Sequence, residues 1–210
     1  LDDTANYINY PQNLTFTPDY WSIDPVNITP GATEALNFSG GYQNLPGAYA
    51  GIEFNDTPLT DNKFIMSFWY NSTKGTDDGS YIFHNYSGGT IGISFFTSSF
   101  NIYANPTTIG SHMMRYYIPA TRTGWHHLVM YMNQGSGSTV DLNNTDNLRI
   151  YVDGSELSVG LVFGDVSASP VRTEANRLGW TTGGNFEGFQ FSNLSLLVGD
   201  NAVLSAIPTL

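Results

Sequence analysis

The sequence predicts an all-β fold, a sandwich of two antiparallel sheets. Short segments in which apolar and polar residues alternate, such as residues 148–152, recur along most of the chain. Paired turn residues, among them Gly40-Gly41 and Gly88-Gly89, separate these segments. No window of ten or more residues has helical periodicity without a helix-breaking residue. Many short strands joined by Gly-rich turns are typical of a sandwich or barrel.

The alternation also gives the place of each strand. We expect strands at residues 34–39, 49–54, 63–70, 80–85, 89–96, 100–104, 113–118, 125–132, 147–152, 155–161, 176–181, 186–197 and 202–206. The third of these has a more apolar face that is expected to enter the core, and this face carries Phe64, Met66, Phe68 and Tyr70. Trp69 points to the opposite face, where it either packs half-buried or offers its ring to a ligand.

The most strongly patterned part of the chain is residues 124–157. Residues 125–132 are apolar on both alternating faces, which is typical of an inner strand covered on both sides, and Trp125 is expected to belong to the core. Asp153-Gly154 directly follows the alternating segment 148–152. Because this pair suits a two-residue turn with positive φ, it predicts a β-hairpin.

The first 32 residues differ from the rest of the chain. Proline recurs at positions 11, 18, 25 and 30, with aromatic residues in between. Proline favours extended backbone and is excluded from central strands. We therefore predict an extended arm over residues 1–32, which packs along its own sandwich or reaches a neighbouring subunit, and one domain over residues 33–210.

Two motifs and their order resemble a known family. Residues 124–129 (GWHHLV) and, after a variable loop, residues 148–154 (LRIYVDG) are similar to the signature of laminin-G-like domains, which belong to the concanavalin A-like lectin and glucanase superfamily. Residues 35–40 (ALNFSG) and 64–70 (FIMSFWY) resemble two earlier strands of that family. The resemblance covers residues 33–205 and implies a concanavalin A-like jelly-roll sandwich.

Charge and composition restrict the possible partners. The net charge is −11 and the seven Lys and Arg residues are scattered, so no basic patch can neutralise phosphates, and neither nucleic acid nor an anionic membrane surface is an expected partner. The absence of a run of about 18 apolar residues argues against direct membrane insertion. The chain has no Cys and begins with Leu1, which indicates a processed product or a fragment.

Because the superfamily includes glucanases, the resemblance raises the question of whether the chain has paired catalytic carboxylates. Retaining glycosidases need two carboxyl groups about 5–5.5 Å apart, and the family places them on one face of a strand. Here no two acidic residues are two or four positions apart, so that pattern is absent, although acids from different strands could still meet. The adjacent His126 and His127 point to opposite faces of a strand and cannot chelate one metal ion together. The sequence therefore predicts that the protein is not an enzyme.

The candidate binding residues lie in or near loops at the rim of the sandwich, where relatives hold sugars and calcium. The candidate sugar-binding residues supply rings for stacking and amides for hydrogen bonds, and they are Trp180, Trp69, Asn143 and Asn144. The candidate ligands of a bound Ca²⁺, which needs six to eight oxygen atoms, are Asp77, Asp78 and Asp146. The alternatives are that Trp180 plugs the sandwich edge and that the Asp and Asn residues only form turns.

Together these observations predict a non-catalytic recognition or adhesion module that binds glycans or glycoproteins. The charge-poor composition, rich in Asn, Ser, Thr and Gly, and the Pro-rich aromatic arm favour a place beside neighbouring subunits in a larger extracellular or virion assembly, such as a spike, fibre or decoration protein. The alternative is a purely structural capsid or assembly module with a lectin-like fold. A glycoside hydrolase is the third class, and it would need two carboxyl groups facing each other across a groove.

Overall fold

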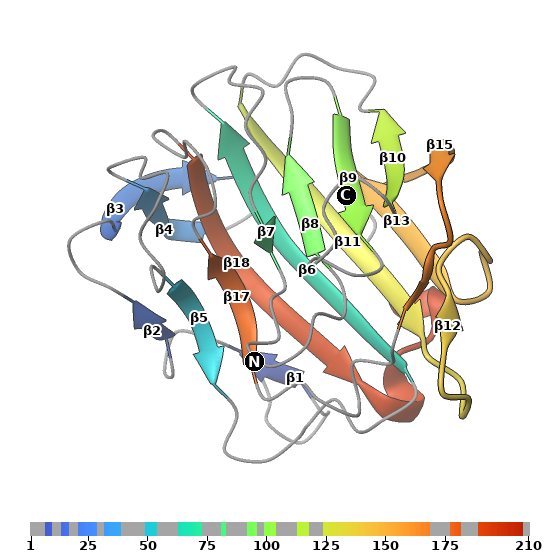
Figure 1. Ribbon diagram of the computed structural model, residues 1–210. Helices are drawn as coiled ribbons and strands as arrows, with labels where there is room; N and C mark the ends of the chain where they lie inside the picture. The colour runs from blue at the N-terminus through green and yellow to red at the C-terminus, as the bar shows by residue number, and fades with distance from the viewer. Residues whose placement is uncertain are drawn as a thin grey trace.

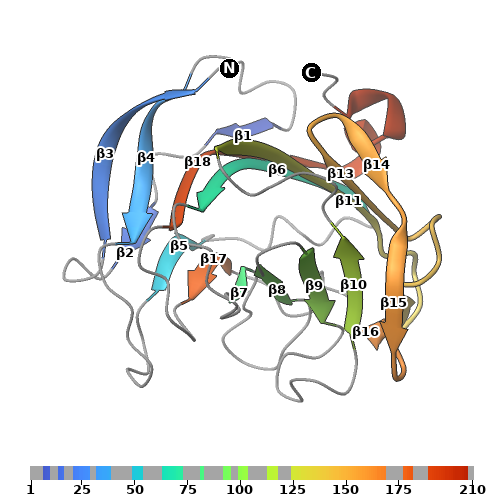
Figure 2. The same ribbon diagram turned by 90° about the horizontal axis from the view of Figure 1, so that it is seen from above.

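The described strands form two antiparallel sheets of eight strands each and one small sheet of two strands. The computed structural model describes residues 7–9, 14–16, 21–28, 32–38, 49–53, 63–72, 81–82, 92–95, 99–103, 113–117, 124–168, 177–181 and 189–207. In Figure 2 the two large sheets lie one above the other, as the layers of a sandwich. The predicted sandwich of two antiparallel sheets is therefore confirmed.

The first sheet contains the longest strands, which cross the molecule diagonally in Figure 1. Its strand order is β14 (Ser155–Leu157), β13 (Leu148–Val152), β11 (Trp125–Asn133), β6 (Lys63–Ser72), β18 (Phe189–Val198), β4 (Ala32–Phe38) and β3 (Trp21–Ile28), and β1 (Tyr7–Asn9) also pairs with β18. All these pairings are antiparallel. The motif-bearing strands β11 and β13 are thus direct neighbours, and β14 pairs with the other side of β13.

The second sheet is made of shorter strands. Its order is β15 (Val159–Phe163), β10 (Met113–Tyr117), β9 (Ser99–Tyr103), β8 (Gly92–Phe95), β7 (Tyr81–Ile82), β17 (Arg177–Thr181), β5 (Tyr49–Glu53) and β2 (Leu14–Phe16). The two-stranded sheet pairs β12 (Val140–Asp141) with β16 (Ser167–Ala168). The chain passes from the edge of the first sheet, β14, to the edge of the second, β15, through Ser158 alone.

The core follows the predicted alternation of β6. The side chains expected inside are at most 1% exposed, and they are Phe64, Met66, Phe68 and Tyr70. On the neighbouring strand, Leu128 and Met130 pair with Phe68 and Met66, and both are fully buried. Burying these large apolar side chains stabilises the sandwich by about 2 kcal/mol each. Trp125, by contrast, is only half-buried, because it lies at the first position of β11, and it contributes less to the core than predicted.

The outward face of the first sheet has its own apolar cluster. Ile65, Val129, Tyr131 and Leu197 pack there with Ala202. The residues around Ala202 were expected to form a strand at 202–206, and this prediction is wrong: they form short 3₁₀ turns, η6 (Gly199–Asn201) and η7 (Leu204–Ala206). The turns fold the chain over the outward face, so Ala202 covers the cluster instead of pairing with a strand. No helix in the described part of the chain is long and apolar enough to cross a membrane.

The β13–β14 hairpin turns at Asp153-Gly154, as predicted. Both residues have positive φ, 50° for Asp153 and 76° for Gly154, which is the backbone of a type I′ turn. The Asp153 carboxylate also accepts hydrogen bonds from the neighbouring strand, at 2.8 Å from the backbone N of His127 and 2.7 Å from His126 Nδ1. The turn is therefore fastened to the start of β11 as well as to its own strands.

The described parts of the predicted arm pair with strands of the same chain. β1 lies against β18, β2 against β5, and β3 against β4. β2 and β3 are edge strands, and Pro25 in β3 is compatible with that place because an edge strand tolerates a missing N–H. The division of the chain at residue 33 stays a prediction.

Candidate functional site

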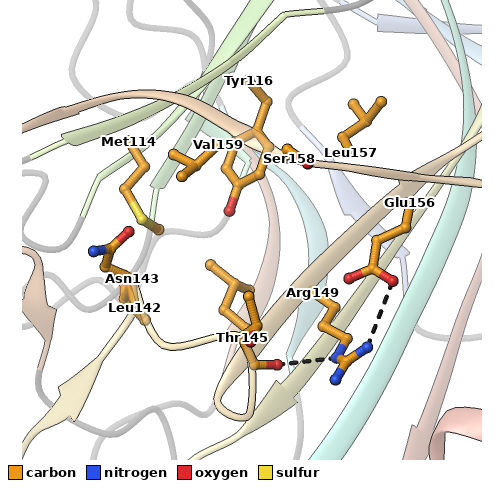
Figure 3. Close-up of a pocket in the computed structure, with 11 residues that line it drawn as sticks. Met114, Tyr116, Leu142, Asn143, Thr145, Arg149, Glu156, Leu157, Ser158 and Val159 are labelled. Carbon is orange, nitrogen blue, oxygen red and sulfur yellow. Dashed lines mark hydrogen bonds and ion pairs between the residues drawn. The ribbon is translucent and has the colours of Figure 1, made fainter.

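A cavity of about 420 Å³ lies at the edge of the sandwich where β14 continues into β15. Strands of both sheets and the loop after β12 line it: Met114, Tyr116, Leu142, Asn143, Thr145, Leu148, Arg149, Glu156, Leu157, Ser158 and Val159. Figure 3 shows these side chains arranged around the open space. We call this space the edge cavity. Its size is in the range of small-ligand sites, which usually combine an apolar surface with a few well-placed polar groups.

Tyr116 is the most buried polar residue that lines the edge cavity. Its ring is buried and stacks on Phe100, with ring centroids 5.3 Å apart and planes at 10°. Burial, with a smaller contribution from the charge of Glu156, raises the pKa of Tyr116 to about 12. The phenol is therefore neutral at physiological pH, and in Figure 3 its hydroxyl points into the cavity, where it can donate and accept a hydrogen bond.

An ion pair forms the polar side of the cavity. Arg149 Nη1 lies 3.5 Å from Glu156 Oε2, and Arg149 Nε donates to the backbone oxygen of Thr145 at 3.0 Å. The hydroxyl of Tyr151 donates to the same Glu156 oxygen at 3.3 Å. Because this pair is partly exposed to solvent, its contribution to stability is small, below about 1 kcal/mol. Its effect is to hold a donor and an acceptor side by side at the mouth of the cavity.

The loop after β12 supplies Asn143, one of the predicted sugar-binding residues. Its backbone N donates to Asp141 Oδ1 at 2.9 Å, and the backbone N of Asp146 donates to Asn144 Oδ1 at the same distance. These two Asx turns fix the loop and leave the exposed Asn143 side chain beside the cavity. Asn144 and Asp146, also predicted site residues, are exposed in the same loop but do not line the cavity.

The other predicted site residues do not gather at the edge cavity. Trp69 is 8% exposed and stacks on His127, with ring centroids 5.0 Å apart, which is the packing alternative. Trp180 lies in β17, four strands along the second sheet from β10, or roughly 19 Å at the usual strand spacing. Its side chain, and the residues Asp77 and Asp78, lie outside the described part of the chain. Among the described residues, no three His, Asp or Glu side chains form a group that could hold a metal ion.

Burial shapes the chemistry of His127 beside Trp69. It lowers the pKa of His127, and the nearby Asp153 carboxylate offsets only part of this effect. The imidazole is therefore neutral in the folded protein at neutral pH. His126, on the other face of the strand, packs near Tyr70 with ring centroids 5.5 Å apart and pairs with Asp153. Both histidines thus take part in packing.

The sequence reasoning did not find Tyr116, Arg149 or Glu156. One signal was available, because a two-residue turn at Asp153-Gly154 fixes the register of the hairpin. In that register Tyr151 pairs with Glu156, which makes Arg149 a diagonal neighbour of Glu156 on the same face. Tyr116 had no such signal, because only the folding of the loop after β12 against β10 brings it to the cavity.

Comparison with solved structures shows the same sandwich in larger binding domains. The chain resembles the binding domain of botulinum neurotoxin DC in complex with rat synaptotagmin II, at 9% identity over 87% of this chain and 43% of that chain, with a TM-score of 0.54. It also resembles the binding domain of paraclostridial mosquitocidal protein 1, at 10% identity, 89% and 44% coverage and a TM-score of 0.54. At such identities the likeness shows the fold alone.

A third similar structure concerns botulinum neurotoxin type C, whose cell entry is described as dependent upon interaction with two ganglioside molecules. The chain is 8% identical to it over 85% of this chain and 42% of that chain, with a TM-score of 0.55. The chain thus spans less than half the length of each of these structures. No curated protein matches the sequence. A family model described as the concanavalin A-like lectin/glucanases superfamily, however, matches residues 46–193, which is more than half of the chain. The chain belongs to the concanavalin A-like lectin/glucanase superfamily.

Proposed function

We propose that this protein is a non-catalytic recognition module that binds a glycan or glycoprotein in the edge cavity. The observation that carries the proposal is the composition of that cavity. Apolar side chains of Met114, Leu148 and Leu157 line it together with the neutral phenol of Tyr116 and the Arg149–Glu156 pair. A sugar ring has apolar C–H faces and hydroxyl groups around its rim, so it can use both kinds of surface at once.

The solved structures support recognition as the class of function. Their descriptions name synaptotagmin II and, in a second structure, SialylT as partners of the botulinum neurotoxin DC binding domain, and ganglioside molecules for botulinum neurotoxin type C. These partners belong to those proteins, and the chain has only part of their length. They support this fold as a binding module, whereas the edge cavity supports the place of binding.

The setting and the metal are also part of the proposal. We place the module on an extracellular or virion surface, as a part of a spike, fibre or decoration protein with neighbouring subunits. A calcium ion held by Asp77, Asp78 and Asp146 would add a second, metal-dependent contribution to sugar binding. Its test is a comparison of binding in calcium with binding after chelation.

Two other classes can be distinguished from glycan recognition. A glycoside hydrolase needs two facing carboxyl groups, whereas Glu156 is the one carboxylate among the described residues that line the cavity. A purely structural assembly module would bind no glycan at all, with or without calcium. A glycan array that gives no binding under both conditions would therefore overturn the proposal in favour of the structural class.

A pair of neighbouring tyrosines tests the site. Tyr116→Phe removes the hydroxyl that points into the cavity and keeps the ring that stacks on Phe100. Loss of one hydrogen bond of about 0.5–1.5 kcal/mol should weaken glycan binding about 2–10-fold. Tyr117→Phe is the matched control, because the next residue along β10 points to the other face and is exposed. Equal binding by the two variants, measured by calorimetry on the best array ligand, would remove the edge cavity as the site.

A further inference from the structure

Strand β15 is an apolar strand that is exposed on both of its faces. Its sequence is VGLVF and all five residues are exposed. The exposed fractions are 36% for Val159, 41% for Leu161, 38% for Val162 and 52% for Phe163. Side chains of a strand alternate between the two faces of its sheet. Exposure of consecutive apolar residues therefore means that neither face of this strand is covered.

The hydrogen-bonding edge of β15 is open as well. In the described part of the chain β15 pairs with β10 alone and is the last strand of the second sheet. Figure 2 shows it at the right-hand side of the molecule. Soluble proteins usually protect such edges with lysines, prolines or inward-pointing charges. β15 has none of these, and residues 157–164 carry no charge at all.

The neighbouring strand extends the apolar surface. Tyr117 of β10 is 52% exposed, and a Cβ atom at Gly160 would lie only 2.4 Å from its ring. The ring thus lies directly over the glycine of β15, where the register of the two strands shifts. Tyr117, Leu161 and Phe163 form one exposed apolar area on the edge of the second sheet.

We propose that β15 is a self-association surface, on which the β15 strands of two copies of this chain pair antiparallel about a two-fold axis near Leu161. This pairing places Leu161 opposite Leu161 and Val159 opposite Phe163. It satisfies the open backbone edge of both copies and joins their second sheets into one continuous sheet. A two-fold contact needs a patch that fits its own copy, and an uncharged apolar strand meets that condition.

The charges around β15 determine how strong this contact is. Glu156 and Asp165 flank the uncharged stretch. In the two-fold pairing Asp165 lies opposite Leu157 of the second copy, so the acids lie at the two ends of the contact and not across from one another. Each copy has a net charge of −11, which opposes association. Salt screens this repulsion, so self-association should strengthen as the salt concentration rises.

The short strand makes a small interface. Stable complexes bury about 1,200–2,000 Å², which two five-residue strands and their neighbours hardly reach. The dimer is therefore a weak one in the isolated chain, and its dissociation constant should fall in the upper micromolar range. In an assembly that holds many copies close together, a contact of this strength is sufficient to bind neighbours.

Sedimentation velocity from about 10 µM to about 1 mM, at low and high salt, tests the proposal. The wild-type chain should shift from monomer to dimer with concentration, and more so at high salt. Leu161→Lys should weaken the dimer at least about tenfold, because the two-fold axis brings the two lysines together. Phe163→Lys should act in the same direction and serves as a second variant should Leu161→Lys fail to fold.

Leu204→Lys is the matched control. Leu204 is also 41% exposed, but it lies in η7 on the outward side of the first sheet, so this variant should dimerise like the wild type. A wild-type chain that stays monomeric at every concentration and salt would overturn the proposal. So would a dimer that Leu204→Lys abolishes and Leu161→Lys does not. A dimer that salt weakens would indicate a contact between opposite charges elsewhere on the surface and would overturn it as well.

Discussion

Asp153 should be one of the most sensitive residues of the fold to substitution, although its own side chain is 44% exposed. Asp153→Ala removes the acceptor of two hydrogen bonds, from the backbone N of His127 at 2.8 Å and from His126 Nδ1 at 2.7 Å. Both donors belong to buried residues. At about 1 kcal/mol for each bond, the loss is about 2 kcal/mol. The positive φ of 50° adds about 1 kcal/mol for an alanine.

The free energy of unfolding should therefore fall by about 3 kcal/mol. For a domain of this size, this loss should lower the Tm by about 6–12 °C. Urea denaturation followed by tryptophan fluorescence measures the loss in free energy. Asp153→Asn separates the contributions, because Asn tolerates positive φ and keeps an acceptor for the backbone N of His127. It should cost less than half as much. A midpoint for Asp153→Ala indistinguishable from that of the wild type would refute the role of this carboxylate in fastening the hairpin to β11.

Three further perturbations follow from the same strands. Gly154→Val should lower the unfolding midpoint, since a β-branched residue resists the φ of 76°, and a matched Gly137→Val, at a glycine with ordinary φ, should not. Because burial lowers the pKa of His127, the unfolded chain binds more protons, so stability should fall as the pH drops below about 6.5. His127→Gln should reduce that fall, measured by urea titration at pH 8 and pH 5. Ala202→Asp should destabilise the cluster under η7 by about 2 kcal/mol or more, in thermal unfolding monitored by circular dichroism, because it buries an unpaired charge at a site that is fully enclosed.

Local patterns were sufficient to predict most of the fold. The position of β13 follows from period-two alternation, because a strand with one buried face must show it in sequence, whereas β11 follows from a run that is apolar on both faces. The turn at Asp153-Gly154 follows from the backbone freedom of those two residue types. Each of these features depends on residues close together in the chain.

The features that sequence did not predict depend on long-range packing. Residues 202–206 are mostly apolar, which suits a strand, but they lie against the outward face of the first sheet and end in the 3₁₀ turn η7. Trp125 is half-buried because it is the first residue of β11, and a sequence pattern does not locate the first residue of a strand to a single position. The edge cavity depends on which strands end each sheet, and that order is set by pairings between residues far apart in the chain.

The edge cavity and the exposed strand β15 have a common structural origin. β14 ends the first sheet, β15 ends the second, and Ser158 alone connects them. One residue is too short for β14 and β15 to run on as neighbours in a single sheet, so the sandwich is joined at this edge by the covalent chain and not by a ladder of hydrogen bonds. The space between the two edges becomes the cavity, and Val159 lines it from the first position of β15. The outer side of β15 is then left without a partner strand in the described chain. A ligand in the cavity and a second copy on β15 would therefore contact opposite sides of the same short strand.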